Sequence, residues 1–169
     1  GHLRLSNGQK LNSPSGLYTR PTTARVREAA MNLVGNKLSN SYWLDLCSGS
    51  GVVSCEALDR GAKKILAIES NTKTAKICQS NLDSVAKRQQ NPDISVIRSE
   101  VVSFLKQGSK KFSQKQKGFL RFDLVYFDPP YKAKIYNPVL GNLLLGQWLK
   151  EDSIVICEHS SSYFLETPS

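Results

Sequence analysis

The sequence contains few of the residues that hold metals or build disulfide frameworks. It has four cysteines and two histidines among 169 residues, and no two cysteines form a Cys-x-x-Cys pair. His2 and His159 are not spaced as zinc ligands around the cysteines. Cys47 and Cys157 fall in apolar runs typical of strands, which favours small buried thiols in a reducing compartment over a metal or disulfide framework. We therefore expect no metal site.

Long apolar runs and secretory signals are also missing. No apolar run approaches the ~20 residues that cross a bilayer, and the N-terminus lacks the charge, apolar stretch and cleavage site of a signal peptide. We expect a soluble, cytoplasmic protein without membrane contact. Because the sequence starts at Gly1 and its one methionine is Met31, an organelle targeting peptide could already have been removed.

Acidic residues are outnumbered, with 14 against 23 lysines and arginines, so the net charge is +9 and the pI is near 9.5. Such an excess favours a polyanionic partner, RNA or DNA, because neutralised phosphates release counterions. Charge alone does not establish such a partner, since many basic proteins bind no nucleic acid. The length and the 40% hydrophobic content suit one globular domain with one core.

Turn signals and apolar periodicity divide the chain into alternating strands and helices. Asn7-Gly8 predicts a two-residue hairpin turn between two short alternating segments. Thr22 or Thr23 can cap a helix that ends at Gly35, with its apolar side formed by Val26, Ala29, Ala30 and Leu33. We expect strands at 42–47, 64–69, 94–97, 122–127 and 153–157, helices at about 51–60, 72–86, 100–105 and 136–149, and a solvated loop at 106–118.

Strands that alternate with helices predict an α/β fold, a Rossmann-like, doubly wound and mostly parallel sheet with helices on both faces. The hairpin and first helix, residues 1–40, are expected to belong to the same domain as residues 41–169. Ligands of such sheets bind outside the carboxyl ends of the strands. Unusual residues at those ends are therefore the candidates for function.

The first two strand ends carry glycines and carboxylates. Asp45 is followed by Gly49 and Gly51, which let the backbone approach a ligand, but Ser54 stands where a dinucleotide fingerprint needs its third glycine. The loop therefore suits an adenosyl cofactor better than a pyrophosphate. Glu69 ends the next strand, where an acidic residue accepts hydrogen bonds from ribose hydroxyls. Glu100, after the third strand, either accepts from an adenine amino group or caps a helix.

The fourth strand ends in Asp128-Pro129-Pro130-Tyr131, the most specific pattern in the chain. The prolines remove backbone donors, so the carboxylate of Asp128 and the carbonyl of Pro129 can both accept N–H bonds from one amino group. Tyr131 offers a flat face for base stacking. The pattern indicates methylation of an amine conjugated to an aromatic ring, and the alternative is a rigid loop with an ordinary buried tyrosine.

These residues make the chain resemble the class I S-adenosylmethionine-dependent methyltransferases, and in particular the RsmD-like family that methylates N2 of one guanine in 16S rRNA. The resemblance covers about residues 3 to 160 and is carried by 20–28 (with Arg-Pro-Thr), 44–62 (with the glycine loop) and 127–131. It implies S-adenosylmethionine as cofactor, and 16S rRNA or the assembling small ribosomal subunit as partner of a monomeric enzyme. It implies cofactor contacts at Asp45, Gly49, Gly51, Glu69 and Glu100, and target-base contacts at Asp128, Pro129 and Tyr131.

The same resemblance implies that Arg20, Arg25 and Arg27 contact rRNA phosphates or shape the cofactor mouth, against solvation or carboxylate pairing as the alternative. Ala24 and Glu100 depart from the family pattern. The family's sheet also ends with a further hairpin beside the fifth strand. Either residues follow Ser169, or that edge is covered in another way.

Three other functions remain open at this point. The acceptor could be adenine N6 or cytosine N4 in DNA or a glutamine amide in a protein, although 169 residues leave no room for a separate target-recognition domain. An inactive RNA-binding scaffold is disfavoured by Asp128 and the two glycines. A nicotinamide dehydrogenase is disfavoured by Ser54.

Overall fold

A parallel five-stranded sheet lies at the centre of the computed structural model, which describes residues 3–14, 23–114, 120–129 and 135–158. The strand order is β5-β4-β3-β6-β7, and all four neighbouring pairs are parallel. This confirms the doubly wound α/β fold. The strands are β3 (Tyr42–Leu46), β4 (Lys64–Glu69), β5 (Asp93–Arg98), β6 (Phe122–Phe127) and β7 (Leu149–Cys157).

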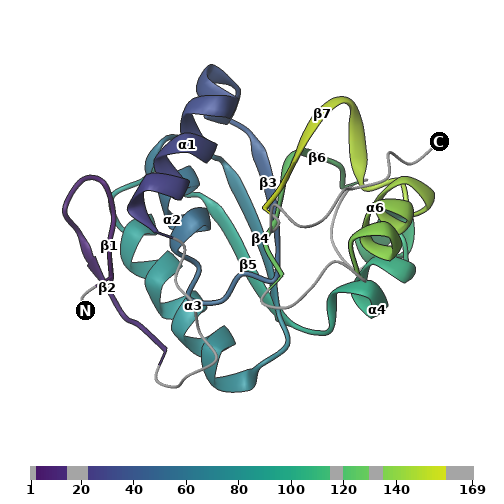
Figure 1. Cartoon of the computed structure of the whole chain (residues 1–169), viewed down its shortest axis with the longest axis horizontal. Helices are drawn as coiled ribbons and strands as arrows, with labels where there is room; N and C mark the ends of the chain where they lie inside the picture. Colours follow the sequence, from purple (N-terminus) through teal and green to yellow (C-terminus); the bar gives the residue numbers. More distant parts are fainter. Residues whose placement is uncertain (1–2, 15–22, 115–119, 130–134, 159–169) are drawn as a thin grey trace.

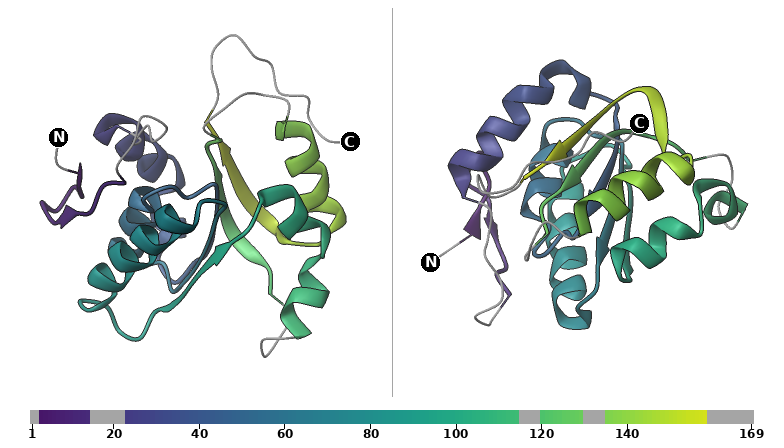
Figure 2. Two further views of the ribbon diagram at one scale, coloured as in Figure 1. Left: turned by 90° about the horizontal axis from the view of Figure 1, so that it is seen from below. Right: turned by 45° about the vertical axis from the view of Figure 1, so that its right-hand side comes forward.

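Helices cover both faces of this sheet (Figures 1 and 2). Buried residues form two separate hydrophobic clusters, one on each face, because each strand alternates its side chains between them. No helix in the described ranges is long and apolar enough to span a membrane. One face carries α1 (Ala24–Val34), the 3-10 helix η1 (Gly35–Leu38), α2 (Val52–Asp59) and α3 (Thr72–Ala86), and the other carries α4 (Val101–Lys106), α5 (Ser109–Gln114) and α6 (Tyr136–Leu145).

The N-terminal hairpin forms as predicted, but its turn is longer than two residues. β1 (Leu3–Arg4) pairs with β2 (Lys10–Leu11) in antiparallel fashion. The Gly8 N–H donates to the Leu5 carbonyl and the Leu5 N–H to the Gln9 carbonyl, and only Gly8 has a positive φ within the turn, at 93°. These bonds define a three-residue loop with a glycine bulge. Asn7 instead accepts the Gln9 N–H with its side chain, at 2.8 Å.

α1 begins and ends where the sequence predicts, with the Thr23 hydroxyl accepting from the Val26 N–H, but its buried face is different. Leu33 is 69% exposed and Ala29 is exposed, which corrects the expected apolar side. The residues that face the core are Arg27, Ala30, Met31 and Val34. Arg27 occupies one position on the buried face of the helix. A prediction based on apolar residues alone does not place it there.

Arg27 is buried because it meets Glu56, a carboxylate on α2 that is fully buried. The Arg27 Nε lies 3.8 Å from Glu56 Oε1, and the Arg60 Nε lies 3.8 Å from Oε2. The Ser6 backbone N–H and hydroxyl both donate to Oε1, at 2.6 and 3.1 Å. Arg27 also donates to the Arg4 carbonyl, at 2.5 Å. These contacts tie the hairpin, α1 and α2 together.

The segment expected as a solvated loop contains α5 in its described part, which corrects the prediction for 106–118. Phe112 is the reason, because its ring packs against Phe104 and Trp148, with centroids 5.2 and 5.8 Å away. The hydroxyl of Ser113 donates to the Ser109 carbonyl at 2.7 Å and accepts from the Leu120 N–H at 2.8 Å. A short apolar anchor thus orders a segment whose composition is otherwise polar.

The last two elements differ from the prediction only in length. α6 ends at Leu145, and Gln147 takes a positive φ of 56° in the turn that follows. Trp148 then enters the core beside Phe122, and β7 starts at Leu149 rather than Ser153. β7 is the outermost strand on its side of the sheet in the ranges that the structure describes, which end at Glu158.

We predict that Glu56→Ala lowers the free energy of unfolding by about 3–5 kcal/mol, because it leaves Arg27 buried without its counter-charge. Glu56→Gln, which can still accept from Ser6, should lose less. Urea unfolding followed by circular dichroism measures both. Asp59→Ala on the same helix removes a partly exposed carboxylate 4.0 Å from Arg88 and should cost under about 1 kcal/mol. Equal losses at positions 56 and 59 would contradict the role given to Glu56.

Candidate functional site

The site lies at the carboxyl ends of β3 and β6, where the order of the sheet reverses. From β3 the chain crosses to β4 on one side, whereas β6 pairs with β3 on the other. The two crossovers diverge at such a point and leave room for a ligand. Asp45 lies near the end of β3, Glu69 ends β4 and Asp128 follows β6. The sheet therefore brings together side chains that are up to 83 positions apart in the chain.

The loop after β3 takes three left-handed backbone conformations, at Cys47 (φ 74°), Gly49 (φ 55°) and Gly51 (φ 82°). A Cβ on Gly51 would lie 2.6 Å from the Cys78 Sγ, so this glycine lets α3 pack against the loop. A Cβ on Gly49 would meet nothing within 4 Å. Gly49 therefore serves the turn and leaves the outer side of the loop open to a ligand.

Asp45 is a buried carboxyl group whose surroundings perturb it strongly. Burial raises its pKa to about 7, the Ser54 hydroxyl opposes that rise, and the charges of Asp128 and Glu69 add to it. The Ser54 Oγ donates to Asp45 Oδ2 at 2.5 Å and accepts from the Trp43 Nε1 at 3.0 Å. Asp45 Oδ1 is buried and has no hydrogen-bond donor among the residues that the structure describes. It is an acceptor available to a ligand.

Glu69 closes the glycine loop from β4. Its Oε1 accepts from the Gly49 N–H at 3.1 Å, and its Oε2 accepts from the Asn71 N–H at 2.7 Å. Asn71 in turn caps α3 by accepting from the Thr74 N–H. The carboxylate is partly exposed, and an oxygen that accepts one N–H has a second lone pair for a ligand hydroxyl.

Glu100 caps α4, the alternative that the sequence left open. Its two oxygens accept from the Val102 and Ser103 N–H groups, both at 2.9 Å, and from the Ser103 hydroxyl at 3.0 Å. Partial burial acts to raise the pKa of Glu100, but these hydrogen bonds outweigh it and hold the pKa below its usual value. A contact of Glu100 with adenine stays a prediction.

The four carboxylates converge on Cys47. Burial raises the pKa of this thiol to about 12, and the charges of Asp45, Glu69, Asp128 and Glu100 raise it as well. A thiolate there would be surrounded by negative charge, which disfavours Cys47 as a nucleophile. No group of three or more histidine, cysteine or acidic side chains in the described ranges is placed to hold a metal ion. The edge is instead acidic in a strongly basic protein, and we call this end of the sheet, with its four carboxylates, the recess.

Asp128 and Pro129 follow β6 directly, with Asp128 half-buried and Pro129 buried. Their position is fixed from β7, because the Glu158 N–H donates to the Phe127 carbonyl at 3.0 Å. Tyr131, the predicted stacking residue, lies outside the described residues. Asp128 follows β6 and Glu69 ends β4, so the two residues lie on opposite sides of β3 at this edge.

The three arginines expected to contact RNA have different surroundings. Arg20 lies outside the described residues, and Arg25 is exposed on α1. Arg27 is buried against Glu56, so its guanidinium is not placed to meet an rRNA phosphate. This corrects the expectation for Arg27 in favour of carboxylate pairing.

A family model described as conserved hypothetical protein 95 matches residues 5–168. The chain belongs to this family, that of the RsmD-like methyltransferases.

Known proteins of this family align over most of the chain. The ribosomal RNA small subunit methyltransferase D of Haemophilus influenzae is 30% identical over 164 residues, which is 97% of this chain and 80% of the relative. Bacillus subtilis YlbH, named as an rRNA methyltransferase, is 30% identical over 90% of this chain and 77% of its own length. The solved structure of Escherichia coli yhhF superposes with a TM-score of 0.80 at 27% identity, covering 100% of this chain and 87% of that one.

The roles of two residues at this RsmD-like site are not predicted by the sequence. At position 54 the sequence indicates only that the third glycine is missing. In the structure Ser54 is fully buried and joins Trp43 to Asp45 by hydrogen bonds. Tyr136, at the start of α6, stands edge-on to Phe127 with centroids 5.1 Å apart. Burial raises the pKa of Tyr136 to about 12, and the charge of Asp128 adds to this. Its hydroxyl donates to the Glu158 carbonyl, and so links α6 to the end of β7.

We predict that Asp45→Asn raises the free energy of unfolding at pH 8, by about 4 kcal/mol at most. The folded-state pKa of about 7 lies above the ordinary aspartate pKa of 3.8. The neutral carboxyl group of Asp45 therefore makes its full contribution to the stability of the wild type below pH 4. This contribution is lost as the pH rises through 7. The variant has no such titration, so the gap between the two proteins should open between pH 4 and pH 7.

Urea unfolding at a series of pH values measures this gap. Asp152→Asn is the matched control, because the Asp152 side chain is 85% exposed. Stability curves of wild type and Asp45→Asn that run parallel from pH 4 to pH 8 would refute the buried titration.

Proposed function

We propose that this chain transfers a methyl group from S-adenosylmethionine to the exocyclic N2 amine of a guanine in 16S rRNA. The observation that carries the proposal is the convergence of Asp45, Glu69 and Asp128 on one edge of the sheet, in a protein with a net charge of +9. A carboxylate recess suits a cationic cofactor, and a basic exterior suits an RNA substrate. The rRNA methyltransferase names of the relatives support the substrate class.

The residues present fit the cofactor. S-adenosylmethionine, when bound, supplies a methyl group activated by a positively charged sulfur. Asp45 offers a buried acceptor, Oδ1, to an ammonium group, and proximity of a cation would favour its ionised form. Glu69 has acceptor capacity for ribose hydroxyls, and Gly49 leaves the loop open. Glu100 follows β5, the strand next to β4, and we propose that it contacts the adenine end of the cofactor.

The same geometry disfavours a nicotinamide dinucleotide. A pyrophosphate would enter a recess ringed by carboxylates, and the energy of like charges a few ångströms apart is unfavourable even at an effective dielectric of about 20. Ser54 fills the place of the third glycine and directs its hydroxyl to Asp45. The loop therefore belongs to a network of carboxylates, which does not favour phosphate binding.

Asp128 and Pro129 suit the acceptor amine. An amine attached to an aromatic ring delocalises its lone pair and is a poor nucleophile. Two acceptors that hold both N–H bonds, the carboxylate and the Pro129 carbonyl, orient the amine so that its lone pair faces the methyl group. We propose that the target base leaves the RNA helix to reach the site and that Tyr131 stacks on this base. Orientation in line is then the main contribution to the rate.

We propose 16S rRNA or the assembling small subunit as the partner, a monomer as the active form and the cytoplasm as the compartment. Arg25 is exposed on α1 and available to a phosphate, and we keep Arg20 as a second candidate from the sequence.

Asp128→Ala should lower kcat by about 100-fold or more while the affinity for S-adenosylmethionine changes little, because the lost contact orients the acceptor. Single-turnover methyl transfer and cofactor titration measure the two quantities. Asp83→Ala, an exposed carboxylate on α3, is the control and should keep full activity. Full activity in the Asp128 variant would remove this residue from the mechanism.

The assay for the function itself uses radiolabelled cofactor and small ribosomal subunits from cells that lack the enzyme, followed by nucleoside analysis. Label in N2-methylguanosine supports cofactor, acceptor atom and substrate together. Label in N6-methyladenine, in N4-methylcytosine or in a protein amide would replace the guanine proposal with the corresponding acceptor. Cofactor binding without label on any of these would support an inactive scaffold.

A further inference from the structure

We propose that a groove at the amino-terminal edge of the sheet, away from the cofactor recess, is a second contact site for the phosphate backbone of the RNA substrate. The inference rests on the proposed function in so far as RNA is the polyanion that such an enzyme meets. The groove has a volume of about 470 Å³. It is lined by Gln107, Gly108, Lys110, Lys111, Gln114, Leu145, Gly146 and Gln147.

Two backbone segments form the floor of the groove. The Ser109 N–H donates to the Gly146 carbonyl at 2.8 Å, which joins the start of α5 to the end of α6. A Cβ on Gly146 would lie 2.5 Å from the Trp148 Nε1, so a glycine lets this turn lie on the tryptophan ring. The floor is therefore fixed by the core beneath it.

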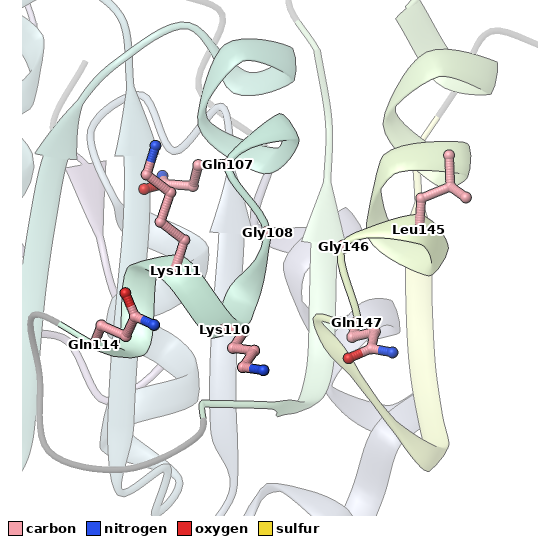
Figure 3. Close-up of a pocket in the computed structure, with 8 residues that line it drawn as sticks. All are labelled: Gln107, Gly108, Lys110, Lys111, Gln114, Leu145, Gly146 and Gln147. Atoms are coloured by element: carbon pink, nitrogen blue, oxygen red, sulfur yellow. The ribbon is translucent and has the colours of Figure 1, made fainter.

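The walls carry positive and neutral polar groups without an opposing carboxylate. Lys110 and Lys111 are exposed, and no carboxylate pairs with either in the part of the chain that the structure describes. Lys110 and Gln147 stand on the two sides of the groove, and Lys111 rises toward Gln107 (Figure 3). Ammonium groups bind phosphate oxygens as point charges, and amides can bond to sugar hydroxyls.

The sequence around the groove is depleted of acidic residues on both sides. In the described ranges, residues 101–114 contain three lysines and no aspartate or glutamate, and residues 135–149 contain no charged residue. These are the segments that supply α4, α5 and α6, the layer opposite α1, α2 and α3. Charge complementarity therefore favours a nucleic acid as the occupant over a basic or neutral protein surface.

The position of the groove defines what kind of RNA can use it. It adjoins the first residues of β6 and β7, since the Phe122 N–H donates to the Trp148 carbonyl. The recess lies at the other ends of the same strands, about 20 Å away along six residues of strand. An RNA that fills both sites must wrap around the α4–α6 layer. We infer that the preferred substrate is a large folded RNA, in which the target guanine and a second backbone segment are held at a fixed distance.

The test compares Lys110→Ala/Lys111→Ala with the control Lys76→Ala/Lys87→Ala. Both pairs are exposed and lower the net charge equally, but Lys76 lies on α3 and Lys87 is its C-cap, on the other face of the sheet. Filter binding to purified 16S rRNA over a range of salt concentrations gives the slope of log Kd against log salt. We expect the slope to fall by about 1 to 2 in the groove variant and by much less in the control.

Three results would overturn the proposal. A slope that is unchanged in the groove variant would mean that Lys110 and Lys111 contact no phosphate. Slopes that are reduced equally in both variants would leave only a nonspecific effect of net charge. Unchanged binding to free rRNA with weakened binding to assembled small subunits would assign the groove to a ribosomal protein. Unchanged affinity for S-adenosylmethionine in both variants checks that the fold and the recess are intact.

Methyl transfer separates this inference from the proposed function. With small subunits as substrate, the groove variant should show a raised KM and an unchanged kcat, because Lys110 and Lys111 do not touch the reacting atoms. If the wild type transfers no label to rRNA, the proposed function fails. The difference in salt slope between the two variants still decides whether the groove binds RNA backbone.

Discussion

A fully buried carboxylate, that of Glu56, is the contact on which the N-terminal part of this structure depends. Removing a carboxylate from water costs several kcal/mol, and the cost is offset only when cations and hydrogen-bond donors surround it. Here Arg27 on α1 and Arg60 at the end of α2 supply the positive charges, each 3.8 Å away, and Ser6 in the hairpin supplies the hydrogen bonds. The hairpin and α1 are thereby held on α2 by charge as well as by apolar burial.

α2 carries this structural contact and a contact to the cofactor recess within one turn, because Ser54 and Glu56 are only two residues apart. Gly51 precedes the helix and shapes the loop, Ser54 bonds to Asp45, and Glu56 bonds to Arg27. All residues of α2 from Val52 to Leu58 are buried. A change that shifts this helix therefore disturbs the hairpin and the recess together, so losses of activity at the hairpin need not mean that the hairpin touches substrate.

Much of the fold follows from local patterns that are strong in this sequence. The bounds of β4 and β6 are predicted to the residue because mostly apolar runs lead up to Glu69 and Asp128, and α3 begins directly after its cap, Asn71. α5 is not predictable from composition, because one aromatic side chain, Phe112, orders a segment of lysine, serine and glutamine. The face of α1 is missed for the opposite reason, since a charged residue occupies a core position.

The candidate site, like the fold, contains residues that the sequence predicts and residues that it does not. Asp45, Glu69 and Asp128 lie at strand ends, and the parallel order of the sheet makes their meeting predictable. The partnership of Ser54 with Asp45 depends on where α2 lies over β3, which no local pattern encodes. Arg27 has the residue type of an RNA contact, and only its burial reveals that it pairs with an internal carboxylate.

The two tryptophans divide between the two layers. Trp43 is fully buried among α1, α2 and α3, and Trp148 is fully buried among α4, α5 and α6. Their indole N–H groups donate to the Ser54 hydroxyl and to the Leu105 carbonyl, respectively. Each layer thus has its own intrinsic fluorophore. The emission of a protein that keeps only Trp43 would report, through Ser54, on the charge of Asp45, whereas Trp148 alone would report on the packing of the lysine-rich layer.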